Sequence, residues 1–182
     1  RLGSGKSSTA KMLAQALGYE HYSTGDFMRS IAEKRGLSLM ELSKIAEGDP
    51  SIDKELDDKN VEIGKMENII IDTRLGFHFI PNSFKVFLEL DPSVAAERIL
   101  EDKKANPNRH KEDTNGFDTK ELILKSIEER SKSERLRYKT LYGIEDFTDP
   151  KHFDLIINTG ENHLEEVSAK IAEEYEKWLN EK

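Results

Sequence analysis

Apolar positions along the chain follow two alternating spacings. Between residues 10 and 17 apolar side chains recur every three or four positions, which predicts a helix over residues 5–17 that ends at Gly18. The same spacing predicts helices over residues 26–34, 38–47, 52–66, 92–104, 118–141 and 164–179. Short apolar runs predict strands over residues 19–22, 68–72, 84–90 and 153–158.

This alternation of strands with helices is typical of an α/β fold with a parallel sheet and helices on both faces. Such folds bind their ligands at the carboxyl ends of the strands. Polar segments stand at three of those ends, at residues 23–26, 72–74 and 158–160. We therefore expect a binding site where these segments meet.

A glycine-rich segment precedes the first predicted helix. Its residues are Gly3, Ser4, Gly5, Lys6, Ser7 and Ser8. Such a segment turns backbone N–H groups into one concavity, and the following helix points its positive end at the same place. Lys6 would reach the outer phosphates of a nucleoside triphosphate, and the Ser7 hydroxyl would ligate Mg²⁺. An ordinary helix start is the alternative, but the segment favours a P-loop NTPase-type three-layer fold with a parallel sheet of about five strands.

The segment is only the second half of the phosphate-loop pattern, which has a further glycine five places before the position of Gly5. An apolar strand normally leads into that glycine. We expect that roughly six to ten residues, the length of a strand and a turn, precede Arg1. The first strand of the sheet would lie in them.

Charge and composition narrow the classes of partner. The chain carries 36 acidic and 28 basic residues, a net charge of −8, whereas proteins that bind nucleic acid non-specifically are basic. It has no cysteine, which excludes disulfides, zinc–thiolate sites and thiol catalysis. No stretch approaches the roughly 18 apolar residues of a membrane span, and no signal peptide is visible. We expect a cytoplasmic monomer, with an oligomer as the alternative, that binds neither nucleic acid nor membranes.

A second candidate anion site follows the strand predicted at residues 19–22. Asp26 suits the N-cap of the next helix, and Arg29 lies in the first turn of that helix. A cation near a helix N-terminus is mildly unfavourable unless it meets an anion there. A capped helix with a solvated arginine is the alternative.

A third cluster lies on the long helix predicted over residues 118–141. Arg130, Glu134 and Arg137 are spaced so that they share one helix face. A surface ladder of ion pairs would have the same spacing, and each such pair contributes only about 0.3–0.5 kcal/mol. Phosphoryl transfer, however, needs several cations around one phosphate. The face also follows a polar segment at residues 105–116 that is typical of a flap.

In their order and spacing, these motifs resemble those of the nucleoside monophosphate kinases, and in particular the short archaeal-type branch of the cytidylate kinase family. The resemblance covers nearly the whole chain and rests on residues 3–8, 23–29, 72–74, 130–138, 142–144 and 153–159. It implies in-line transfer of the γ-phosphoryl group of ATP to CMP or dCMP, with Mg²⁺ as cofactor. A small kinase for AMP, UMP or a non-nucleotide metabolite, or a non-enzymatic nucleotide-binding switch, is the alternative.

The resemblance also implies roles for individual residues. The ATP site would comprise Gly3, Ser4, Gly5, Lys6, Ser7, Ser8, Arg109 and Asn158, with Ser7 as the metal ligand. The acceptor site would comprise Thr24, Gly25, Arg29, Lys59, Arg74 and Glu134. The catalytic residues would be Lys6, Asp72, Arg74, Arg130 and Arg137, of which the last two would close over the reaction centre.

On the same resemblance, residues 1–182 form a single P-loop kinase domain. Within it, residues 26–66 would be a helical NMP-binding region and residues 103–117, approximately, a mobile lid. The acceptor base would be read by donors and acceptors between residues 38 and 66. The last helix of this region carries Asp57, Asp58, Lys59 and Glu62.

Overall fold

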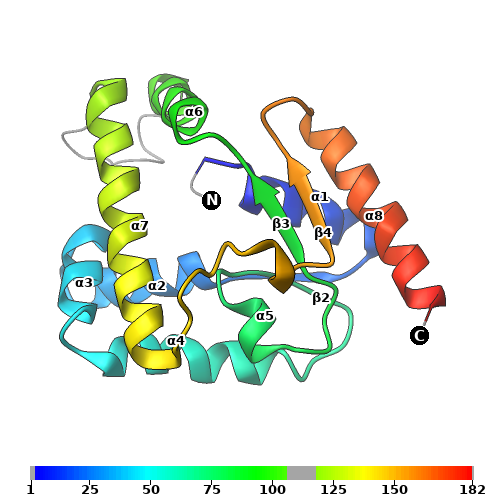
Figure 1. The fold of residues 1–182 in the computed structure, drawn as a ribbon, viewed down its shortest axis with the longest axis horizontal. Coiled ribbons are helices and arrows are strands. Elements are labelled where there is room, and N and C mark those ends of the chain that lie inside the picture. The colour runs from blue at the N-terminus through cyan, green and yellow to red at the C-terminus, as the bar shows by residue number, and fades with distance from the viewer. Residues whose placement is uncertain (1–2, 106–117, 182) are drawn as a thin grey trace.

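The computed structural model describes residues 3–105 and 118–181 (Figure 1). Its helices are α1 (Lys6–Leu17), α2 (Thr24–Lys34), α3 (Leu39–Ala46), α4 (Pro50–Ile63), α5 (Gly76–Phe79), α6 (Pro92–Ala105), α7 (Lys120–Tyr142) and α8 (Leu164–Asn180). Its strands are β1 (Glu20–Ser23), β2 (Ile69–Asp72), β3 (Val86–Glu89) and β4 (Leu155–Asn158). Every helix and strand that the apolar spacing predicted is confirmed, at slightly different bounds. In the part of the chain that is described, no helix is long and apolar enough to cross a lipid bilayer.

Side-chain caps fix where several helices begin. The Ser38 hydroxyl accepts from the backbone N–H of Glu41, and the Glu41 carboxylate accepts from the N–H of Ser38, which is a capping box at the start of α3. The cap of α2 differs from the prediction, because Ser23, and not Asp26, accepts the backbone N–H at its start. Asp26 instead lies in the first turn, where its carboxylate interacts favourably with the positive end of the helix dipole.

Two short elements were not predicted. One is a 3-10 turn at Pro150–His152, whose start is capped by the Asp149 side chain. The Asp-Pro pair could have indicated this turn. The other is α5, which has no side-chain cap hydrogen bond and therefore no cap signal in the sequence.

The strands form two parallel pairs, β1 with β2 and β3 with β4. Within the pairs, Ser23 lies opposite Asp72 and Glu89 opposite Asn158. The carboxyl ends of paired strands therefore lie side by side, as the alternation of elements predicted. The further strand expected before Arg1 stays a prediction.

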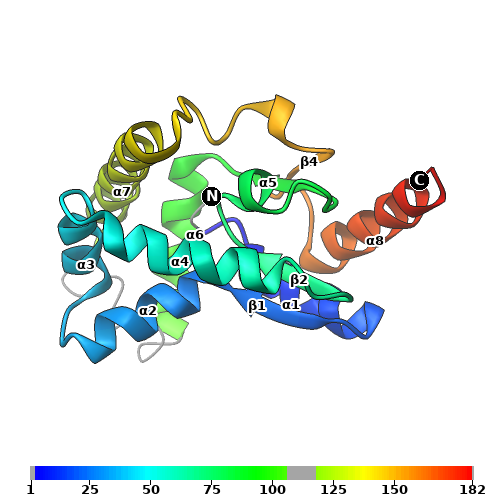
Figure 2. The same ribbon diagram turned by 90° about the horizontal axis from the view of Figure 1, so that it is seen from below.

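Different sets of helices enclose different cores. Helices α2, α3 and α4 pack around one cluster, which includes Met28, Leu42 and Ile52. A second cluster joins α1 and α8 to β3 and β4, through Leu13, Leu88, Ile157, Val167 and Ile171. Figure 2 shows α2, α3 and α4 gathered on the opposite side of the molecule from α8. The cleft described next lies where these parts meet.

Candidate active site

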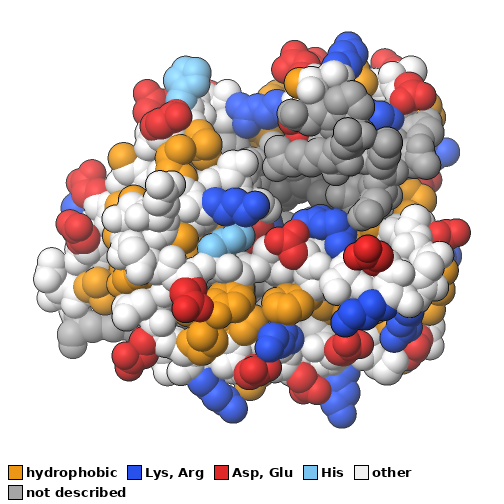
Figure 3. Space-filling model, turned by 180° about the vertical axis from the view of Figure 1, so that it is seen from behind, with side chains coloured by type: hydrophobic (Ala, Val, Ile, Leu, Met, Phe, Trp, Pro, Cys, Tyr) orange, Lys and Arg blue, Asp and Glu red, His pale blue; other side chains and the backbone are white. Residues whose placement is uncertain are grey.

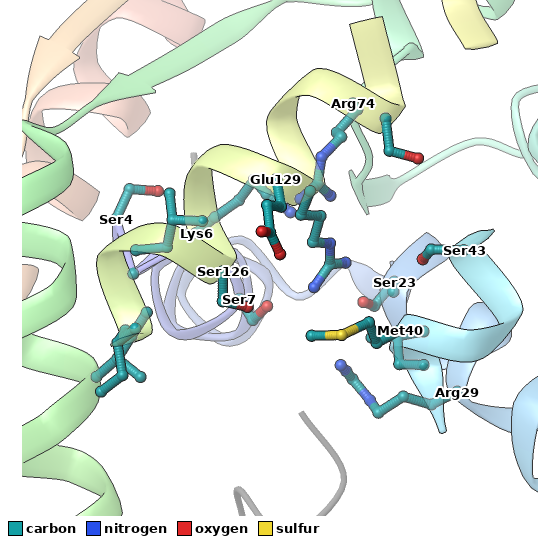
Figure 4. A pocket seen from close by; sticks show the side chains of 18 of the residues that line it. Ser4, Lys6, Ser7, Ser23, Arg29, Met40, Ser43, Arg74, Ser126 and Glu129 are labelled. Atoms are coloured by element: carbon teal, nitrogen blue, oxygen red, sulfur yellow. The ribbon is translucent and has the colours of Figure 1, made fainter. Parts of the chain in front are cut away.

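A cleft of about 1240 Å³ brings together the segments that the sequence singled out. Its walls come from the glycine-rich loop, α2, α3, α6 and α7. Figure 3 shows the surface hollowed on the face opposite the view of Figure 1, with Lys and Arg side chains at the edge of the hollow. In Figure 4, Lys6, Arg29 and Arg74 extend from different elements into the same space.

The glycine-rich loop is held by its backbone conformation and by α6. Gly3 and Gly5 have φ of 72° and 75°, a region that favours glycine. A Cβ at Gly3 would also lie 3.0 Å from the Ala95 carbonyl oxygen and Cβ. Ser4 between them is buried. The loop therefore packs tightly on α6 while its following helix starts at the cleft.

Lys6 and Ser7 meet Asp72 at the start of α1. Asp72 is buried at the end of β2. Its Oδ2 accepts a hydrogen bond of 2.5 Å from the Ser7 hydroxyl, and its carboxylate forms an ion pair with Lys6. Burial in the cleft and the nearby Arg74 cation lower the pKa of Lys6 to about 7.

One carboxylate holds two arginines. Glu134 accepts from Arg74 Nε at 2.6 Å and from Arg130 Nε at 3.2 Å. Burial raises the pKa of Glu134, but Arg74 and Arg130 outweigh it and hold that pKa below its usual value. Both arginines line the cleft. Because Glu134 and its ion pairs with the two arginines are buried, this helix face is not a series of solvent-exposed ion pairs, which was the alternative interpretation.

Arg137 lines the smaller cavity beside the main cleft, and its predicted closure over the reaction centre stays a prediction. Its side chain is buried, with Nε 3.4 Å from Asp53 Oδ2 on α4 and Nη1 donating to the Ser43 carbonyl at 3.4 Å. The Arg137 side chain shares a face with Glu134, but that face packs against α3 and α4 at this level. Arg137 therefore ties α7 to the helices that form the other wall.

The start of α2 reaches the cleft through its backbone and Arg29. Gly25 and Arg29 line the cleft, and Arg29 forms an ion pair with Asp26. Thr24 turns the other way, because its hydroxyl donates to Asn60 Oδ1 on α4 at 2.9 Å. Thr24 and Asn60 line a smaller cavity of about 60 Å³ beside the main cleft.

Two predicted residues, Lys59 and Asn158, line neither cavity. Lys59 pairs with Glu62 at 2.8 Å and is not among the lining residues of either cavity. Asn158 closes the turn after β4, where its Oδ1 accepts from the Gly160 N–H. Arg109, with most of the predicted lid at 103–117, lies outside the described residues.

Four further polar side chains line the smaller cavity from α4 and α7, namely Asp53, Asp57, Asn60 and Tyr138. Sequence reasoning named Asp57 as a candidate to read the acceptor base, but missed the other three. Asp53 and Asn60 are spaced from Asp57 so that the three share one helix face, the same signal that picked out the arginine face. Burial raises the pKa of Asp57 to about 6, although a hydrogen bond from the Tyr142 hydroxyl opposes this rise.

The comparisons with known proteins agree with this geometry. A family model described as an AAA domain matches residues 3–116. A shikimate kinase from Bacteroides thetaiotaomicron has the same fold, with a TM-score of 0.56 and 18% identity over 96% of this chain and 93% of that one. The fold is thus the P-loop kinase fold that the sequence predicted.

Relatives of higher identity match nearly the full chain. An S-adenosylmethionine-dependent nucleotide dehydratase from Lacinutrix mariniflava is 37% identical over 96% of this chain, but this chain spans only 34% of that protein. The cytidylate kinase of Natronomonas pharaonis is 39% identical over 93% of this chain and 82% of its own length. That of Aeropyrum pernix is 35% identical over 94% and 92%. Because these two kinases are 39% and 35% identical to this chain, which spans 82% and 92% of their lengths, the chain belongs to the cytidylate kinase family.

Proposed function

We propose that the chain transfers the γ-phosphoryl group of ATP to CMP or dCMP. One observation carries the proposal: the phosphate loop and a separate group of arginines, Arg29, Arg74 and Arg130, line the same cleft. A protein that only binds a triphosphate has no use for a second cluster of cations. The identity with cytidylate kinases over most of the chain supports CMP as the acceptor.

In this proposal the donor lies at the start of α1. The backbone N–H groups of the glycine-rich loop and the N-terminal end of α1 hold the phosphates of ATP. Lys6, whose pKa is near 7, is stabilised in its charged form when the phosphates arrive. Arg109 in the lid would contact the same phosphates on closure.

Ser7 and Asp72 fit a magnesium site. A hydroxyl and a buried carboxylate stand 2.5 Å apart, and oxygen atoms are the ligands that Mg²⁺ prefers. The described residues contain no cluster of three or more His, Asp or Glu suited to a metal. This agrees with Mg²⁺, which is commonly held by one or two protein oxygens together with substrate phosphates. Bound there, Mg²⁺ would neutralise charge on the β- and γ-phosphoryl oxygens.

The arginines supply the rest of the chemistry. A phosphoryl group in transit spreads charge over three equatorial oxygens. Arg74 and Arg130, held in place by Glu134, stabilise that charge without having to reorganise. The acceptor phosphate attacks in line, so no activated side-chain nucleophile is needed. Closure of the lid at 103–117 and of the helical region at 26–66 excludes water, which would otherwise take the phosphoryl group.

A coupled assay of ADP release tests the proposal. The chain with MgATP is offered CMP, dCMP, UMP, AMP or shikimate. We expect turnover with CMP and dCMP, weaker turnover with UMP, and none with shikimate. If none of the nucleoside monophosphates is phosphorylated, the proposed function is wrong. Omission of Mg²⁺, with EDTA present, should abolish turnover.

A further inference from the structure

The smaller cavity has polar groups on α4 that phosphoryl transfer does not use. It is lined by Arg74 and Arg130, which also line the main cleft, and by Asp57 and Asn60 of α4. If the phosphate of the acceptor lies at the arginines, the rest of the nucleotide extends toward α4. The groups on α4 are therefore placed to meet the base.

Asp57 presents a carboxylate oxygen to this cavity. The Tyr142 hydroxyl at the end of α7 donates to Asp57 Oδ2 and fixes the side chain. That bond leaves Oδ1 as an acceptor for a ligand. The other carboxylate on this face, Asp53, is already paired with Arg137. Asp57 is thus the acidic side chain of α4 that is placed to accept a hydrogen bond from a bound base.

Asn60 presents a donor beside it. The Thr24 hydroxyl donates to Asn60 Oδ1 at 2.9 Å, so the amide oxygen is turned toward α2. The amide nitrogen is therefore the group that can donate to a ligand. Asn60 is only 5% exposed, which limits the freedom of its side chain. Asp57 and Asn60 lie three residues apart, so they are neighbours on one helix face.

We propose that Asp57 and Asn60 select the acceptor base, an inference that rests on the proposed function. Asp57 accepts a hydrogen bond from the exocyclic amino group of cytosine, and Asn60 donates one to the adjacent ring nitrogen. Uracil carries a carbonyl oxygen and an N–H at those two places. It would lose both bonds and bring its carbonyl oxygen against the carboxylate of Asp57.

The substitution Asp57→Asn tests this assignment. Asparagine keeps an acceptor for Tyr142, so the fold should be retained, and its amide can donate to the uracil carbonyl. The ratio of kcat/KM for CMP to that for UMP should fall about tenfold to a hundredfold. The control is Asp58→Asn, which removes an exposed carboxylate of the same helix that lines neither cavity. It should leave the ratio unchanged.

Asn60→Asp provides a second, independent variant. It replaces the donor by an acceptor, which suits the ring N–H of uracil, and it still accepts from Thr24. The CMP-to-UMP ratio should fall again. Tyr142→Phe should raise KM for CMP with kcat largely kept, because Tyr142 only positions Asp57. An unchanged ratio in active Asp57→Asn and Asn60→Asp proteins would overturn the inference and leave the proposed function standing. Failure of the unsubstituted protein to use any nucleoside monophosphate would remove the proposed function itself.

Discussion

Glu134 is the residue on which the arginine cluster depends. It is buried and accepts from both Arg74 and Arg130. A buried charge is costly unless it is paired. One carboxylate between two guanidinium groups leaves net positive charge in the cleft, which suits a phosphate ligand. Arg137, three residues later, is buried and is paired with Asp53 instead.

This difference predicts separate effects of two arginine substitutions. Arg74→Ala should lower kcat by about 10³ or more while the Kd for ATP is nearly kept, because the proposed function places the transferred phosphate beside Arg74. Arg137→Ala leaves the buried Asp53 unpaired and should lower the free energy of unfolding by about 3–5 kcal/mol. The ADP-release assay, ATP titration calorimetry and urea denaturation measure these quantities. An Arg137→Ala protein of normal stability would contradict the structural role.

The raised pKa of Asp57 has a cost in stability that depends on pH. The pKa of Asp57 is about 6 in the folded protein, above the usual aspartate value of 3.8. The protonated Asp57 carboxyl therefore contributes its full share to the free energy of unfolding below pH 3.8. This contribution is lost as the pH rises through 6. Asp57→Asn does not titrate, so its gain in unfolding free energy over the unsubstituted protein should be larger at pH 8 than at pH 5, by about 1 kcal/mol. Urea denaturation at the two pH values measures this, with Asp58→Asn as the control that shows little change.

At the scale of elements, the phosphate loop depends on α6. A comparison of Gly3 with Gly18 tests this contact. Both glycines have a positive φ, 72° at Gly3 and 68° at Gly18, so an alanine strains the backbone at either position. A Cβ at Gly3 meets Ala95 of α6 at 3.0 Å, whereas a Cβ at Gly18 meets nothing within 4 Å. Both alanine substitutions strain the backbone by about 1 kcal/mol. The contact with α6 is what distinguishes them.

Gly3→Ala should therefore weaken ATP binding by about tenfold or more, because the loop must shift away from α6. Gly18→Ala should lower thermal stability no more than Gly3→Ala does, and it should leave the ATP affinity unchanged. Calorimetric titration with ATP and thermal denaturation separate the two effects. Equal ATP affinities of the Gly3→Ala and Gly18→Ala proteins would refute the contact.

Periodicity and punctuation predicted the long elements because both are local properties. The helix over Lys120–Tyr142, for example, has its cap at Thr119 and its end at Gly143 within the sequence itself. The phosphate loop and the arginine positions could be predicted because few residue types perform their chemistry. Asn158 shows the limit of this approach, since a residue suited to a nucleotide contact is equally suited to closing a turn.

At the scale of the whole molecule, the site is made by contacts between distant parts of the chain. Arg74 meets Glu134 across 60 residues, and Tyr142 meets Asp57 across 85. Local spacing of residues cannot predict a contact between side chains so far apart in the sequence. The sequence could place Arg137 on the face of Glu134, but not show that Asp53 would cover it. Sequence reasoning expected the base to be read between residues 38 and 66, but it could not give the shape of the smaller cavity, which segments from residue 6 to residue 138 line together.

The separate hydrophobic cores have a consequence for hydrogen exchange. The core enclosed by α2, α3 and α4 shares no buried residue with the one that joins α1 and α8 to β3 and β4. Regions with their own cores tend to open as separate cooperative units. We expect amides of α2–α4 to exchange as one group and those of α1, β3, β4 and α8 as another.

The two nucleotides should affect these groups differently, because a ligand stabilises the region that it binds. CMP should slow exchange mainly in the first group and ATP mainly in the second, as mass spectrometry of exchanged peptides would measure. Uniform slowing by either nucleotide alone would mean that the molecule opens as a single unit.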